Sequence, residues 1–144
     1  MNFDTLYKRF RSFNLENVLF KTFSDAGIKS FIIELNKERQ LFAKGVGVNG
    51  EIVGYYSFVT SLINPSKKFN SPYNFKDTGE MFRSFRVIVD KQGFTIDADA
   101  EKLVDSNIID KESQILGLTN ESKAELVKEI APQIAEQIRN ALLS

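Results

Sequence analysis

The sequence contains no cysteine, no histidine and no tryptophan in its 144 residues. Without cysteine the protein has no disulfide, no thiolate nucleophile and no thiolate ligand for a metal. Without histidine it has no ordinary catalytic triad and no imidazole ligand. These absences remove most of the familiar catalytic repertoire, and we expect a protein with no cofactor and no metal.

Motifs that mark common enzymes are missing as well. The phosphate-cradling pattern Gly-x-x-x-x-Gly-Lys-Ser/Thr does not occur, and the glycine-rich stretch at residues 45–50 lacks the βαβ context of a dinucleotide site. Serines such as Ser57 and Ser84 have neither a histidine base nor a nucleophile elbow. We therefore predict that the protein is not an enzyme.

Three carboxylates lie close together in the sequence, at Asp97, Asp99 and Glu101. Oxygen clusters of this kind bind calcium or magnesium, which makes a hard-cation site one interpretation. The stretch lacks the glycine turn and the bidentate glutamate spacing of a calcium-binding loop. We interpret it instead as the solvated face of a strand.

The charges balance, with 19 Lys and Arg against 19 Asp and Glu. With no net positive charge, the protein as a whole does not attract nucleic acid or an anionic membrane electrostatically. Any contact with DNA must therefore come from a local group of basic residues. The apolar runs are interrupted well before the roughly 18 residues of a membrane span, and the N-terminal segment carries Asp4 in place of a basic stretch. We expect a soluble protein made in a cytoplasm, with no membrane partner.

A chain of this length fits one domain with a substantial core. We predict a single α+β domain over residues 1–144, with residues 1–14 as a candidate N-terminal arm and residues 61–76 as a long loop. The 13 phenylalanines supply an aromatic core and leave some aromatic surface for a partner.

Apolar residues at spacings of three and four predict helices in the N-terminal half. The pattern favours a short helix over residues 3–12, which either packs on its own domain or docks on a neighbouring subunit. Asn14 can cap a second helix over residues 15–22, and Ser24 or Asp25 can cap a third. The apolar stripe of this third helix consists of Ile28, Phe31, Ile32 and Leu35.

A long C-terminal helix is predicted after Thr119, which can cap it. Pro132 lies inside the pattern and removes a backbone donor, which predicts a kink near residues 128–132 or two abutting helices. The stripe either packs over the sheet or meets another subunit. It consists of Val127, Ile130, Ala131, Ile134, Ile138, Ala141 and Leu142.

Two hairpins are indicated. Alternation of apolar and polar residues predicts strands over residues 85–90 and 94–98, joined by the three-residue loop Lys91-Gln92-Gly93. Asn49-Gly50 is a strong turn signal that favours a smaller hairpin between residues 44 and 56. Residues 101–113 are typical of a short helix or a docking segment.

The loop at residues 61–76 is dense in turn-forming residues and mixes basic with aromatic side chains. One interpretation is a loop that reaches a partner ring or a DNA-containing channel; the other is a solvated loop held by two or three aromatic residues. The candidate contact residues are Lys67, Lys68, Phe69, Tyr73 and Lys76.

The segment Asp77-Thr78-Gly79 follows this loop. Asp77 and Thr78 are good N-caps, and Glu80 completes an Asp-x-x-Glu capping arrangement, so a short helix is predicted to open near Gly79. An aspartic protease also uses Asp-Thr-Gly, but a single copy would have to dimerise to pair its carboxylates. We interpret the motif as structural.

This region resembles the virion-morphogenesis or tail-completion proteins of tailed bacteriophages. In that family a Leu-x-x-Thr-Gly-x-Leu-x-x-Ser-like element leads into a sheet, and Phe75 and Phe82 stand here in place of the leucines. Residues 40–57 are similar to the family's glycine-bearing loop after a helix, and residues 115–119 to its closing Phe-Leu-Gly-Leu-Ser element. The chain lacks the family's frequent Tyr-Ala-x-x-His-x-x-Gly segment.

The resemblance implies a structural protein of the virion neck or tail end, made in the bacterial host cytoplasm. It implies a homo-oligomeric ring, which we expect to be six- or twelve-fold, in contact with adjacent neck or tail proteins. Non-specific contact with DNA in the lumen is a further expectation. Two other functions stay open: a nucleic-acid-binding module that uses residues 67–86, and a small protein-interaction domain.

Overall fold

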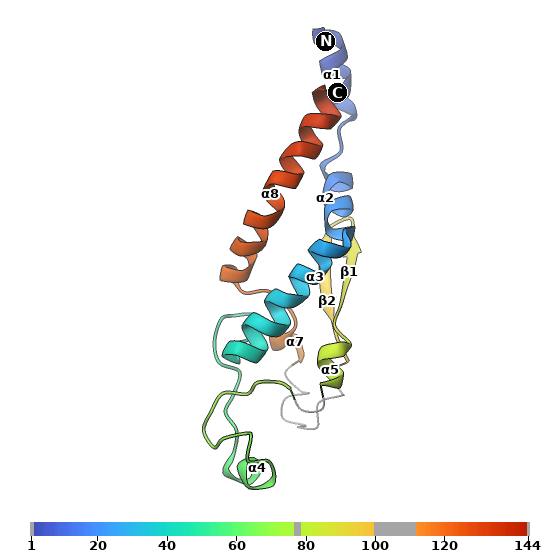
Figure 1. The fold of residues 1–144 in the computed structure, drawn as a ribbon. Coiled ribbons are helices and arrows are strands. Elements are labelled where there is room, and N and C mark those ends of the chain that lie inside the picture. The colour runs from blue at the N-terminus through green and yellow to red at the C-terminus, as the bar shows by residue number, and fades with distance from the viewer. Residues whose placement is uncertain (1, 77–78, 100–111, 144) are drawn as a thin grey trace.

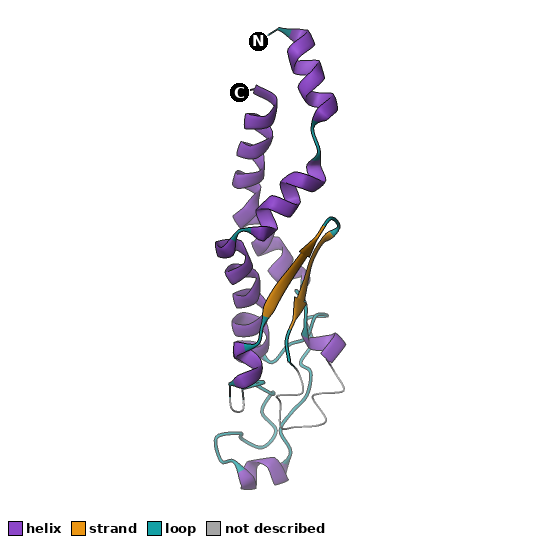
Figure 2. Ribbon diagram, turned by 90° about the vertical axis from the view of Figure 1, so that its right-hand side faces the viewer, coloured by secondary structure: helices purple, strands orange, loops and turns teal. Residues whose placement is uncertain are grey.

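The computed structural model describes residues 2–76, 79–99 and 112–143. It confirms a small α+β domain in which helices pack against one antiparallel hairpin. The molecule is elongated, with the N- and C-terminal segments at one end and helix α4 at the other (Figures 1 and 2). The elements are α1 (Phe3–Ser12), α2 (Leu15–Ser24), α3 (Ala26–Glu34), the π-helix η1 (Leu35–Phe42), α4 (Phe58–Ile63), α5 (Glu80–Arg83), β1 (Arg86–Asp90), β2 (Gly93–Asp97), α7 (Glu112–Ile115) and α8 (Asn120–Leu143).

Side-chain caps begin the first three helices. The carboxamide oxygens of Asn2 and Asn14 accept from the third residue beyond each, at 2.9 and 3.3 Å. Asp25 does the same for the amide of Ile28, at 3.1 Å. The predicted helix starts are therefore confirmed, and of the two caps proposed for the third helix the structure uses Asp25.

The hairpin pairs β1 with β2, from Arg86 opposite Asp97 to Asp90 opposite Gly93. Because Asp90 and Gly93 are themselves paired, the connection is a two-residue turn, and the predicted three-residue loop is wrong by one residue. The predicted faces are confirmed: Val87 is buried while its neighbours on β1 point to solvent. Helices α2 and α3 lie against this hairpin.

The hydrophobic core lies between the hairpin, α3, η1 and the first half of α8. It is closed at one side by α5, whose Met81 and Phe82 are buried, and by Phe75 just before it. Aromatic rings meet edge to face, as in the pair Phe23 and Phe94 at 5.0 Å between centroids. The fully buried aliphatic residues at the centre are Ile32, Leu35, Leu41 and Ile115.

Helix α8 is a single element of 24 residues that runs without a break through Pro132. The alternative of two abutting helices is therefore wrong. Thr119 caps it as predicted, since its hydroxyl accepts from the amide of Ser122 at 3.1 Å. The buried face of its first half is Ser122, Leu126 and Ile130.

Part of the predicted stripe on α8 needs correction. Val127 is exposed, because it lies about 100° around the helix from Leu126, and Ala131 is exposed for the same reason beside Ile130. Residues four apart form the contact line in this half of the helix. Further along, Ile134 and Ile138 are half-buried, as the stripe predicts.

Residues 44–56 form an isolated bridge between Val46 and Ile52 in place of the predicted hairpin. The ladder does not extend past Gly45, because the amide of Gly45 donates to the carbonyl of Leu41 at 3.0 Å. In the turn, the amide of Val48 donates to the carbonyl of Gln114 at 2.7 Å. The backbone comes so close that a Cβ on Gly47 would lie 2.5 Å from that same carbonyl oxygen. This loop is thus anchored to the C-terminal part of the chain.

Two buried carboxamides join η1 to the segment that leads into α8. Asn36 donates to the carbonyl of Ile115 at 2.9 Å and accepts from the amide of Gly117 at 3.0 Å. Gln40, one helical turn later, donates to the carbonyl of Gly117 at 2.9 Å and accepts from the amide of Thr119 at 3.0 Å. We call these four hydrogen bonds the carboxamide clamp.

The short helix predicted near Gly79 is confirmed as α5, whose N-cap is Gly79 in the left-handed conformation at φ 83°. The N-cap makes no side-chain hydrogen bond. Asp77 and Thr78 lie outside the described residues, as do residues 101–111 of the segment predicted as a short helix or a docking segment. The last two residues of that segment, 112 and 113, are described and belong to α7 (Glu112–Ile115).

Replacement of Asn36 by alanine is expected to destabilise the protein strongly. The change leaves the carbonyl of Ile115 and the amide of Gly117 buried without partners, and each such group costs about 1–3 kcal/mol. Urea unfolding followed by circular dichroism should show a loss of about 2–4 kcal/mol. Asn49→Ala, which alters an exposed carboxamide, is the control, and equal losses for the two variants would contradict the assigned role.

Replacement of Gly47 by alanine tests the close backbone approach. The new Cβ would overlap the carbonyl oxygen of Gln114, which cannot rotate away, so the free energy of unfolding should fall by about 1–3 kcal/mol. Gly50→Asn is the matched control, since nothing lies within 4 Å of Gly50 and asparagine tolerates its positive φ. A neutral Gly47→Ala variant would contradict the packing.

Candidate interaction surfaces

The five contact residues predicted in the loop at 61–76 do not form one surface. Tyr73 is half-buried and packs edge to face on the ring of Tyr56, at 5.0 Å. Lys76 lies over the ring of Phe42, at 5.4 Å from its centroid. Tyr73 and Lys76 therefore pack at the base of the loop, while Lys68 and Phe69 lie exposed at its far end.

The ammonium group of Lys67 lies over the ring of Tyr56, at 5.5 Å from its centroid. Its side chain is half-buried, whereas that of Lys68 is exposed. Within this loop, Lys68 is thus the predicted cation most open to a partner.

The far end of the loop is a compact tip built on α4. The first three residues of the predicted loop belong to this helix, which Ser57 caps by accepting from the amide of Thr60 at 3.1 Å. Phe58 and Phe69 pack edge to face with 6.0 Å between ring centroids. We call residues 58–69 the α4 tip.

A stem holds the α4 tip in place. The backbones of residue 56 and residues 70–71 exchange two hydrogen bonds of 2.9 Å, and the amide of Tyr73 donates to the carbonyl of Gly54 at 3.0 Å. The tip therefore projects from a paired backbone.

The α4 tip exposes large apolar side chains that a folded monomer normally covers. Ile63 is 79% exposed and Leu62 is 66% exposed. Phe58, Val59 and Phe69 are exposed to a similar degree. An apolar cluster of this kind at a projecting end makes the α4 tip a candidate binding surface. Sequence reasoning missed Val59, Leu62 and Ile63, although the apolar run Phe58-Val59 followed by Leu62-Ile63 is a visible signal.

The opposite end of the molecule carries a second apolar surface, on α1. None of the residues of α1 is buried, and Phe3 is 78% exposed. The helix lies against the end of α8, where Arg9 donates to the carbonyl of Leu142 at 3.4 Å. An open hollow of about 280 Å³ has an entirely apolar lining made of Phe3, Leu6, Tyr7, Phe10 and Leu142.

The predicted arm thus packs on its own domain and still presents an aromatic face. We call the face formed by these lining residues the α1 face. The α4 tip and the α1 face lie at the two ends of the long axis (Figure 1).

The side chain of Arg86 binds two of the three carboxylates that were considered as a cation site. Its guanidinium pairs with Asp97 directly across the hairpin and with Asp99 at 3.4 Å. Desolvation lowers the pKa of Arg86 and the attraction of the two carboxylates raises it, with the balance above its ordinary value. The described residues contain no cluster of three or more metal-ligating carboxylates. Glu101, the third residue of the predicted cluster, lies outside them.

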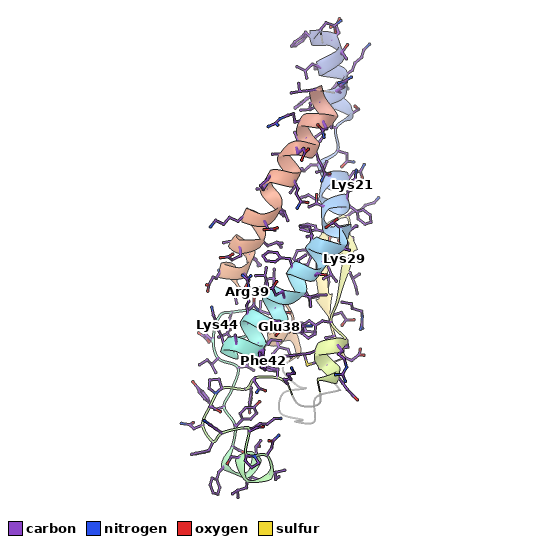
Figure 3. The ribbon with its side chains drawn as sticks, in the orientation of Figure 1. Lys21, Lys29, Glu38, Arg39, Phe42 and Lys44 are labelled. Atoms are coloured by element: carbon purple, nitrogen blue, oxygen red, sulfur yellow. The ribbon has the colours of Figure 1, made fainter. Side chains whose placement is uncertain are left out.

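The hollow at the start of α8 is lined by basic and acidic side chains that form ion pairs with one another. It has a volume of about 310 Å³ and is bordered by η1, the loop at 46–50 and α8. Figure 3 labels Arg39, on η1, and Lys44, which follows it. Arg39 pairs with Glu125 at 3.9 Å, and Lys44 pairs with Glu121 at 3.6 Å. All four side chains are about half exposed or more, so these ion pairs contribute little stability.

Comparison of the chain with protein-family models, curated proteins and solved structures finds no match.

In the described part of the chain, no helix combines the length and apolar character needed to cross a bilayer.

The segments that carry the phage resemblance meet in space. Gln40 of the first is hydrogen-bonded to Gly117 and Thr119 of the last, and Phe75, Phe82 and Phe85 of the middle one pack in the same core. These three segments therefore pack together in the body of the domain, and the α1 face and the α4 tip lie outside them.

Replacement of Arg86 by glutamine should cost little stability. The ion pairs are about half exposed, and pairs of this kind typically contribute about 0–1 kcal/mol. Urea unfolding should show a loss below about 1 kcal/mol, with the same fold by circular dichroism. A loss of several kcal/mol would contradict the assignment of Arg86 to a solvated surface.

Proposed function

We propose that this protein is a structural subunit that acts by assembly, as part of a ring in the neck or tail end of a tailed bacteriophage. The observation that carries the assembly role is the pair of exposed apolar surfaces at opposite ends of one ordered domain. Repeated around a closed axis, different surfaces of neighbouring copies form heterologous contacts.

The virion assignment comes from the sequence resemblance. It implies that copies form a ring, and that the α4 tip or the α1 face meets a neighbouring copy, an adjacent neck or tail protein, or the lumen. An elongated subunit with contact surfaces at both ends is suited to such a place. The proposed location is the virion, with synthesis in the bacterial host cytoplasm.

The described geometry gives less support to the nucleic-acid-binding alternative. Its basic set comprises Lys67, Lys68, Lys76, Arg83 and Arg86. Arg86 is paired with two carboxylates, and Lys67 and Lys76 lie over aromatic rings. Binding through such a set would be electrostatic and would weaken steeply with salt. A small interaction domain with no virion role would share the apolar surfaces but would not enter a particle.

Sedimentation velocity over a concentration series tests the assembly role. The wild type should self-associate, and Phe3→Ser combined with Phe10→Ser should weaken the association at least about tenfold, since each buried aromatic ring contributes about 1.5–3 kcal/mol. Ile88→Ser, which removes an exposed apolar residue on the hairpin, is the control. A wild type that stays monomeric throughout would contradict the proposal. A double variant that associates like the wild type would remove the α1 face from the contact between copies and leave only the α4 tip.

Negative-stain microscopy tests the virion assignment separately. Co-expression with the products of the flanking genes should yield particles or rings that contain this chain. If this chain is absent from every such particle, the phage role is ruled out and a small protein-interaction domain becomes the favoured function.

A further inference from the structure

We propose that two copies of the chain pair through their α1 faces, with the two α1 helices antiparallel about a two-fold axis. This inference rests on the proposed assembly role and names the partner of one of its two surfaces, a second copy of this chain. A two-fold contact closes on two copies, so it leaves the α4 tip available for contacts that repeat around a ring.

The spacing of the apolar residues on α1 is symmetric. Phe3, Leu6, Tyr7 and Phe10 are separated by three, one and three residues, so the pattern reads the same from either end of the helix. A two-fold axis between residues 6 and 7 places Phe3 opposite Phe10 of the second copy, and Leu6 opposite Tyr7. A two-fold contact requires such self-complementarity, because each surface meets a copy of itself.

The charges beside the rings are complementary in the same arrangement. At about 100° per residue, Asp4 and Arg11 lie on one flank of α1, about a quarter of a turn from Phe3. In an antiparallel pair each flank faces the same flank of the other helix. Asp4 then lies about 3 Å along the axis from Arg11 of the second copy, and the symmetry forms this ion pair twice. Arg11 is directed towards the face, since its guanidinium lies over the ring of Tyr7 at 5.9 Å from the centroid.

The other two basic residues of α1 lie away from the contact. Arg9 is directed to α8, where it donates to the carbonyl of Leu142 at 3.4 Å. Lys8 lies about 140° around the helix from Phe3, towards the side opposite the rings. Both therefore lie outside the face that meets the second copy.

The exposed aromatic area approaches what a stable pair needs. Phe3 is 78% exposed, Phe10 is 66% exposed and Tyr7 is 52% exposed. Because an aromatic side chain buries about 150–250 Å², these rings supply about 800 Å² from the two copies together. Specific interfaces begin at about 1,200 Å². The rest comes from the apolar hollow beside the rings, whose lining includes Leu6 and Leu142.

Two other occupants fit the α1 face less well. The α4 tip has lysines and no carboxylate within residues 58–69, so it offers Arg11 no opposite charge. An anionic lipid surface would bring its headgroups against Asp4 at the edge of the rings. A second α1 provides an opposite charge for both residues, and charge complementarity therefore selects it.

Crosslinking tests the antiparallel pairing, because the wild-type chain has no cysteine. An Asp4→Cys subunit that carries a size tag is mixed with an untagged Arg11→Cys subunit and treated with a short bis-maleimide. The mixed pair keeps one of its two ion pairs. We expect mixed dimers at least about tenfold more abundant than Arg11→Cys homodimers, whose two cysteines lie about 13 Å apart along the axis.

Predominant Arg11→Cys homodimers, or no mixed dimers in a preparation that sedimentation shows to be oligomeric, overturn the antiparallel pairing and leave the assembly role standing. A wild type that is monomeric throughout overturns both.

A charge exchange gives an independent readout. Asp4→Arg should weaken pairing about tenfold, and so should Arg11→Glu, because each places like charges at both flank contacts. An equimolar mixture of the two variants should recover the wild-type affinity in mixed pairs, since opposite charges then meet at both contacts. A variant that merely frays α1 would not be rescued by mixing.

Lys91→Glu in the hairpin turn is the control for a change of net charge. A mixture that stays as weak as the single variants, or equal weakening by Lys91→Glu, overturns the inference.

Discussion

The carboxamide clamp is the interaction on which the rest of the structure depends. Asn36 and Gln40 are buried on η1, and their four hydrogen bonds satisfy the backbone between residues 115 and 119 at the point where the chain turns into α8. A segment about 80 residues later in the chain is thereby joined to the N-terminal half. Buried polar groups that are fully satisfied specify one arrangement, whereas a half-satisfied set would destabilise it. The start of α8, and with it the core between α3, the hairpin and α8, follows from this junction.

An ordered middle explains how the two ends can remain apolar and exposed. The core side chains and the carboxamide clamp hold the centre, so neither α1 nor α4 is needed to close it. The α1 face and the α4 tip are each attached by a short ordered connection, and both present side chains that water solvates poorly. Partner binding would cover that surface without rebuilding the fold. The two exposed apolar surfaces of this chain are thus separate from the residues that stabilise it.

Periodicity and capping signals predicted much of the fold and less of the candidate surfaces. Asn14, Asp25 and Thr119 begin helices as predicted because capping is a local interaction between a side chain and an amide three residues away. The hairpin faces follow from alternation in β1.

The carboxamide clamp could not be predicted from the sequence, because nothing local distinguishes Asn36 and Gln40 from solvent-facing carboxamides on a helix. The hairpin predicted around Asn49-Gly50 is reduced to one bridge, because the amide of Gly45 donates to the carbonyl of Leu41 and the carbonyl of Gly54 accepts from the amide of Tyr73. Residues 61–63 of α4 were assigned to the loop at 61–76, because a helix of six residues is too short to show a helical period.

The central claim is that a rigid clamped middle carries two ends that are reserved for neighbouring copies. Amide hydrogen exchange, compared between the dissociated and the assembled protein, tests it most directly. The amides of Gly117 and Thr119 should exchange slowly and equally in both states, while those of residues 3–12 and 58–69 should exchange fast in the dissociated protein and slow down on assembly. Fast exchange at Gly117 and Thr119 in the dissociated protein, or unchanged exchange at both ends on assembly, would contradict the account.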